Sequence, residues 1–147
     1  MSVLRNDLQV ALNDLHVALM ESADHYRYAA EFVSDALTGE LFETLAEARD
    51  LLADEAEEAI RDSGDLPSVP DVDRETGEQL LQRLEAVFSA DEAADVMAQR
   101  LEGEAQFEEL LNTPEIKAID KDYPTLRRAC LQSIEVAREK LNGSAPS

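Results

Sequence analysis

The chain has 147 residues, a length that predicts one domain with a single core. It carries 33 acidic and 13 basic residues, for a formal net charge of -20. That charge argues against nucleic acid and anionic membrane surfaces as partners. Aromatic residues make up only 5% and Trp is absent, and the apolar content is mostly Ala and Leu, which favours helices over strands.

The first half of the chain predicts two long amphipathic helices, at about residues 3–37 and 39–63. Apolar residues recur at helical spacing in both, and no proline interrupts either segment. Thr38 and Gly39 are expected to form the short turn between them, which predicts an antiparallel hairpin.

The second half begins with a segment that contains Pro67 and Pro70 and predicts a crossover loop. A short helix is expected at about 74–88. Ser89, with Glu92 three residues later, forms the pattern of a capping box and predicts the start of the third long helix.

The third long helix is expected at about 90–112 and the fourth at about 124–141, followed by a tail at 143–147. Between them, Pro114 predicts a short turn of helix over about 115–120. Residues 1–142 are therefore expected to form an all-α, ferritin-like four-helix bundle, with an extra short helix in the crossover connection.

Several stretches resemble a bacterial family of ferritin-like bundles that carries only a domain-of-unknown-function label. They are LNDL at 12–15, HYRYAAE at 25–31, LFETLAEARDLLADE at 41–55, GDLP at 64–67 and the Glu-rich segment 90–112. The resemblance covers most of the chain. It implies the fold and brings no activity with it.

Ferritin-like bundles often hold two metal ions, through a Glu from each of two helices and a Glu-x-x-His from each of the other two. This chain departs from that pattern, because its two histidines, His16 and His25, both lie on the first helix. Glu104 and Glu108 are expected to face inward. One hypothesis is therefore a divergent iron-binding oxidase or storage protein, which holds iron or manganese through Glu104 and Glu108 with His25.

The preferred interpretation of Glu104 is different. Arg49 lies close to the centre of the apolar stripe of the second helix, between Leu45 and Leu52. We expect it to pair with Glu104 inside the bundle, because a planar guanidinium can bind a carboxylate through two hydrogen bonds. Ser22, Tyr26 or Ser133 would complete a buried polar cluster. Glu108 would then reach solvent near its helix end.

No catalytic residue and no cofactor is predicted. Cys130 lies in an apolar stripe and is expected to be a packed thiol. The expected function is a non-catalytic binding or structural protein that self-associates as a homodimer, and a small-ligand carrier has no specific sequence signal. Because the N-terminus lacks the apolar segment of a signal peptide, a cytoplasmic location is expected.

Charge is uneven along the chain, which bears on self-association. Residues 40–65 contain ten acids and two bases, whereas residues 115–147 contain five acids and six bases. The last helix is therefore expected to attract the acidic second helix of another copy.

Overall fold

The computed structural model describes residues 5–67 and 92–143. Within these residues every element of regular secondary structure is a helix and no strand is present, which confirms the all-α prediction. The elements are α1 (Asp7–Phe32), α2 (Ala36–Asp62), α4 (Glu92–Leu111), α5 (Pro114–Lys117), the 3-10 helix η1 (Ala118–Lys121) and α6 (Leu126–Gly143).

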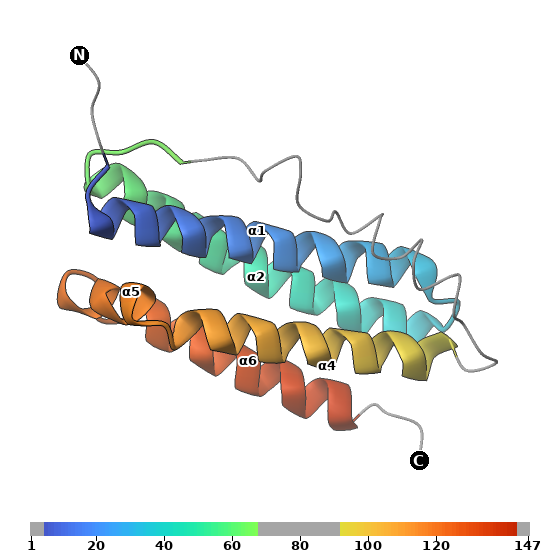
Figure 1. The fold of residues 1–147 in the computed structure, drawn as a ribbon. Coiled ribbons are helices and arrows are strands. Elements are labelled where there is room, and N and C mark those ends of the chain that lie inside the picture. The colour runs from blue at the N-terminus through green and yellow to red at the C-terminus, as the bar shows by residue number, and fades with distance from the viewer. Residues whose placement is uncertain (1–4, 68–91, 144–147) are drawn as a thin grey trace.

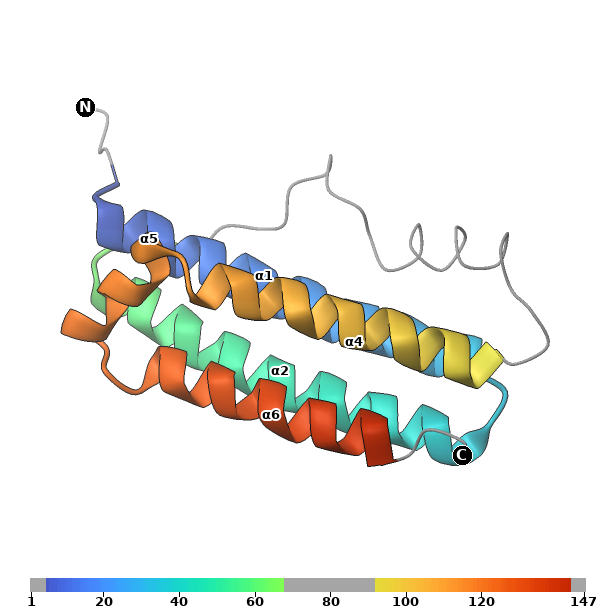
Figure 2. The ribbon, with the colours of Figure 1, turned by 60° about the horizontal axis from the view of Figure 1, so that its bottom comes forward.

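The four long helices α1, α2, α4 and α6 lie side by side (Figures 1 and 2). Helix α1 contacts α2 and α4, and α6 contacts the same two helices. The pairs α1/α6 and α2/α4 therefore face each other across the diagonals. Figure 1 shows that α2 ends at one end of the bundle and α4 begins at the other, so these two helices run parallel.

The first interhelical turn was predicted in the wrong place. Helix α1 ends at Phe32, five residues earlier than expected, because the backbone of Val33 is extended (φ -76°, ψ 141°). Helix α2 then begins at Ala36, where the Asp35 carboxylate accepts hydrogen bonds from the backbone N–H (2.9 Å) and the hydroxyl (2.6 Å) of Thr38. Thr38 and Gly39 thus belong to α2, and Asp35 is the residue that starts it.

The other predicted boundaries lie within four residues of the observed ones, and the largest difference is the start of α1 at Asp7 instead of about residue 3. Pro114 opens α5 at the first helical position, and the turn continues as η1. Helix α6 begins at Leu126, two residues later than expected. The predicted helix at 74–88 and the cap at Ser89 lie outside the described residues.

Buried apolar side chains form two clusters along the bundle. The first lies around α5 and η1 and includes Leu12, Ile60, Leu111, Ile119 and Ile134. The second includes Tyr26, Phe42, Val96, Met97 and Leu141. None of the described helices has the length and apolar character that a membrane crossing requires.

Candidate functional site

An ion pair between α2 and α4 lies in the bundle interior. Arg49 and Glu104 are each 1% exposed. Arg49 Nη1 donates to Glu104 Oε2 at 3.0 Å, and Arg49 Nη2 donates to Oε1. Both carboxylate oxygens are therefore held by one guanidinium, in the two-pronged geometry that is strongest for this pair. The pair joins the two helices that face each other across a diagonal.

The remaining long helices hold the pair through hydroxyl groups. Arg49 Nη1 donates to Ser22 Oγ of α1 at 2.9 Å, and Nε donates to Ser133 Oγ of α6 at 3.0 Å. The Tyr26 hydroxyl of α1 donates to Glu104 Oε2 at 3.0 Å. The structure thus brings together all the residues of the expected polar cluster, and each long helix contributes at least one.

Tyr26 acts as a neutral donor within this polar cluster. Burial raises the pKa of its phenol well above the ordinary value, and the neighbouring Glu104 carboxylate raises it further. The phenol keeps its proton at neutral pH and can donate to Glu104. The guanidinium carbon of Arg49 lies 5.9 Å from the centre of the Tyr26 ring and 5.1 Å from that of Phe107. Because Phe107 belongs to one apolar cluster and Tyr26 to the other, the ion pair lies between the two.

Arg100 is a second buried arginine that the sequence interpretation missed. It lies on α4 and is 2% exposed. Its guanidinium carbon is 5.3 Å from the centre of the Tyr26 ring, and its Nε donates to Gln99 Oε1 at 2.6 Å. The available signal was its spacing, since Arg100 precedes Glu104 by four residues and therefore shares its face of the helix.

The expected inward face of α4 was rotated from the observed one. Leu101 is only partly buried, whereas the most deeply buried residues of the helix are Val96, Met97, Arg100, Glu104, Phe107 and Leu111. The face expected from helical spacing leaves Arg100 outside the bundle; it passes through Ala94, Met97, Leu101, Glu104, Glu108 and Leu111. The structure shows that the bundle accommodates Arg100 and turns Leu101 towards the edge.

Glu108 does not face the interior as the metal hypothesis requires, and it reaches solvent as the preferred interpretation predicts. Its side chain is 41% exposed and accepts hydrogen bonds from Arg138 of α6, from Nη1 to Oε2 at 3.0 Å and from Nη2 to Oε1 at 3.1 Å. These hydrogen bonds hold the pKa of the Glu108 carboxyl below its usual range. Arg138 stands three residues after Glu135, where a Glu-x-x-His motif would have its histidine, and it is the partner of Glu108.

The residues around Glu104 do not fit a di-metal centre. Both Glu104 oxygens accept hydrogen bonds from Arg49, whose positive charge would repel a metal ion at the same carboxylate. His25 is half-buried on α1, next to Tyr26 and therefore about 100° away around the helix. Within residues 5–67 and 92–143, no three His, Cys, Asp or Glu side chains are grouped so that they could hold a metal ion.

Cys130 is fully buried in the first apolar cluster, between Leu126 and Ile134 on the inner face of α6. Burial raises the pKa of its thiol to about 12, so the nucleophilic thiolate is scarce at neutral pH. Its environment is that of a packed thiol.

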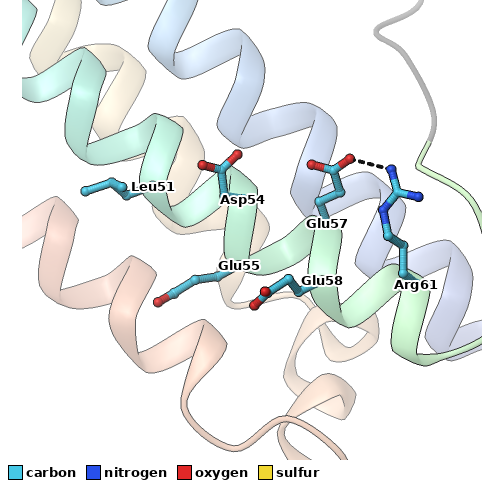
Figure 3. Close-up of a pocket in the computed structure, with 6 residues that line it drawn as sticks. All are labelled: Leu51, Asp54, Glu55, Glu57, Glu58 and Arg61. Atoms are coloured by element: carbon cyan, nitrogen blue, oxygen red, sulfur yellow. Dashed lines mark hydrogen bonds and ion pairs between the residues drawn. The ribbon is translucent and has the colours of Figure 1, made fainter.

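The outer face of α2 carries an acidic hollow that is separate from the polar cluster. It is lined by Leu51, Asp54, Glu55, Glu57, Glu58 and Arg61, whose side chains project from one helix in Figure 3. Arg61 Nη2 pairs with Glu57 Oε1 at 2.7 Å, and both side chains are well exposed. The hollow is a solvated surface feature with an apolar side chain, Leu51, at its edge.

The chain was compared with protein-family models, with characterised proteins and with solved structures, and no match was found. Its function is therefore argued from the geometry of the buried cluster and of the helix surfaces.

Proposed function

We propose that the chain is a ferritin-like four-helix bundle whose centre is held by the Arg49–Glu104 ion pair, and that it acts as a binding or structural protein. The observation that carries the proposal is that one arginine holds both oxygens of Glu104. In a metal-binding bundle such a carboxylate would be a ligand. The parallel course of α2 and α4 supports the ferritin-like assignment, because it requires a long connection between the second and third long helices.

The buried pair suits a protein whose role depends on a defined shape. A buried ion pair adds little net stability, because the cost of desolvation offsets the attraction. Its geometric demands are strict, however, since Ser22, Tyr26 and Ser133 must all lie within hydrogen-bond distance. The cluster thereby sets the relative positions of four helices, and the bundle can present fixed outer surfaces to a partner.

Metal analysis tests the absence of a metal centre. Protein purified without added metal is expected to contain iron and manganese far below one equivalent per chain by plasma mass spectrometry. About two equivalents, lost in Glu104→Ala, would instead establish the divergent iron-binding oxidase or storage protein. Glu108→Ala and His25→Ala serve as comparisons, because that alternative places both residues at the metal.

The face formed by α2 and α6 is the surface we propose for self-association. These helices contact each other and lie together in Figure 2. Leu51 of α2 is 68% exposed and Val136 of α6 is 46% exposed. Each of these two residues follows a buried residue of its own helix by two positions. Because successive residues are about 100° apart around a helix, both side chains point away from the interior.

Charge favours a two-fold arrangement of this face. The outer side of α2 carries Asp54, Glu55 and Glu58, whereas the exposed charges of α6 are balanced, with Arg128 and Lys140 against Glu135 and Glu139. A two-fold axis that runs between α2 and α6, parallel to them, would place α2 of one copy over α6 of the other. The acidic side of α2 would then face the less acidic α6 instead of another α2, and Leu51 would be covered.

Light-scattering mass measurements test this dimer. We expect a dimer at about 0.05 M sodium chloride that dissociates more readily at about 0.5 M, where the Debye length falls from about 14 to about 4 Å. Leu51→Glu should give a monomer. Val10→Glu is the matched control, because Val10 is 46% exposed on α1, away from the proposed face. A monomer at both salt concentrations would contradict self-association.

A further inference from the structure

The buried cluster contains more positive than negative charge. Arg49, Arg100 and Glu104 are all at most 2% exposed, so two guanidinium groups share the interior with one carboxylate. Tyr26 contributes no charge at neutral pH, because its phenol holds its proton. The cluster therefore carries one positive charge in excess.

Hydrogen bonds from Arg49 use both carboxylate oxygens of Glu104. Among the described residues, Arg100 therefore has no carboxylate with which to form an ion pair. Both Glu104 oxygens accept from Arg49, and Oε2 also accepts from Tyr26. In the part of the chain that the structure describes, Arg100 forms no ion pair, and its one hydrogen bond runs from Nε to Gln99. The Tyr26 ring offers it a cation–π contact at 5.3 Å.

This arrangement is costly for a charged group. A guanidinium that has left water needs hydrogen-bond acceptors for its N–H groups and a counter-charge. Burial lowers the pKa of Arg100, and Arg49 lowers it further, whereas the electrostatic effects of Tyr26 and Glu104 raise it. Arg100 nevertheless remains protonated at neutral pH, since arginine does not lose its proton in proteins.

We propose that Arg100 anchors an interior binding site for a small carboxylate. A carboxylate matches the planar guanidinium with two parallel hydrogen bonds and supplies the single negative charge that the cluster lacks. The Tyr26 ring lies beside the guanidinium on the α1 side, and Glu104, four residues further along α4, already accepts hydrogen bonds from Arg49 and Tyr26. This assignment goes beyond the proposed function, because it requires only the geometry and charge of Arg100.

Gly103 is the residue that makes room for the guanidinium. A Cβ atom at this position would lie 3.0 Å from Arg100 Nη2 and 3.2 Å from Cζ. Any side chain there would displace the guanidinium by a few tenths of an ångström. A glycine within a helix costs stability relative to alanine, so the bare backbone beside Arg100 is consistent with a requirement for space.

The test is thermal unfolding of the full chain in sodium HEPES, with sodium acetate replacing buffer salt at constant ionic strength. Acetate at ten times its dissociation constant should raise the Tm by about 3–6 °C. The Arg100→Met variant, which keeps much of the side-chain volume, should lose this shift. Arg27→Met, which removes an exposed arginine of α1, should retain it.

Gly103→Ala provides a second variant that leaves the charge in place. It should weaken acetate binding several-fold in calorimetric titration while the unliganded protein stays folded, because alanine favours the helix. Equal acetate shifts in the native protein and Arg100→Met would overturn the proposal. So would a larger shift with sodium chloride than with acetate, since a halide cannot form the two-pronged contact. Metal content and light-scattering mass are separate measurements, so failure of this site is distinguishable from failure of the proposed function.

Discussion

Glu104→Gln is expected to lower the free energy of unfolding by about 3–5 kcal/mol, because it leaves Arg49 charged and buried without its carboxylate. Arg49→Met should cost a similar amount, since it leaves the Glu104 carboxylate in the interior with Tyr26 as its remaining donor. The double variant should lose clearly less than the sum, because neither charge is then left without the other.

Urea unfolding followed by far-ultraviolet circular dichroism at neutral pH measures all three variants. The Glu108–Arg138 pair is the matched control, because it has the same chemical groups and the same two-pronged contact at the surface. Glu108→Gln should have a much smaller effect, since water solvates the partner left behind. Additive losses at Arg49 and Glu104 would show that the two side chains do not depend on each other for stability.

Periodicity was sufficient to place Arg49 opposite Glu104. Arg49 falls between Leu45 and Leu52 on a helix whose other charges lie outside, so its inward position follows from the apolar stripe. Glu104 likewise follows Met97 by seven residues on the inner face of α4. An arginine and a glutamate that both face inward have few other ways to satisfy their charges.

Arg100 could not be found in the same way. The stripe through Leu101 and the observed stripe through Phe107 each contain four apolar residues, so a hydrophobic criterion does not select the observed rotation of α4. What decides the rotation is the polar pairing, since Arg49 and Tyr26 both require Glu104 in one orientation. That requirement involves three helices at once and cannot be read from the periodicity of any one of them.

The break between α1 and α2 has a similar explanation. The segment around Val33 lacks proline and glycine, so helical periodicity predicts that the first helix continues to residue 37. The start signal is the Asp35 carboxylate, which binds the backbone N–H of Thr38. Aspartate is frequent throughout this acidic chain, so a capping aspartate is hard to distinguish from a solvated one by sequence.

Phe42→Ala is expected to lower the free energy of unfolding by about 3–5 kcal/mol, through lost apolar burial and the cavity that remains. Phe42 is fully buried on α2, in the second apolar cluster. Its ring centre lies 6.1 Å from that of Tyr26, with the planes tilted by 41°. The same variant should therefore loosen Tyr26, which donates to Glu104.

This second effect can be separated from the cavity cost with Tyr26→Phe, which removes only the hydroxyl. If Phe42 helps to hold the Tyr26 hydroxyl against Glu104, Tyr26→Phe should cost less in a Phe42→Ala background than in the native protein. Leu37→Ala is the control on the same helix, because Leu37 is 76% exposed and its truncation should change stability by no more than about 0.5 kcal/mol. Equal costs of Tyr26→Phe in both backgrounds would mean that the hydroxyl is positioned by the polar cluster alone. Apolar packing and the buried ion pair would then be independent determinants of the bundle.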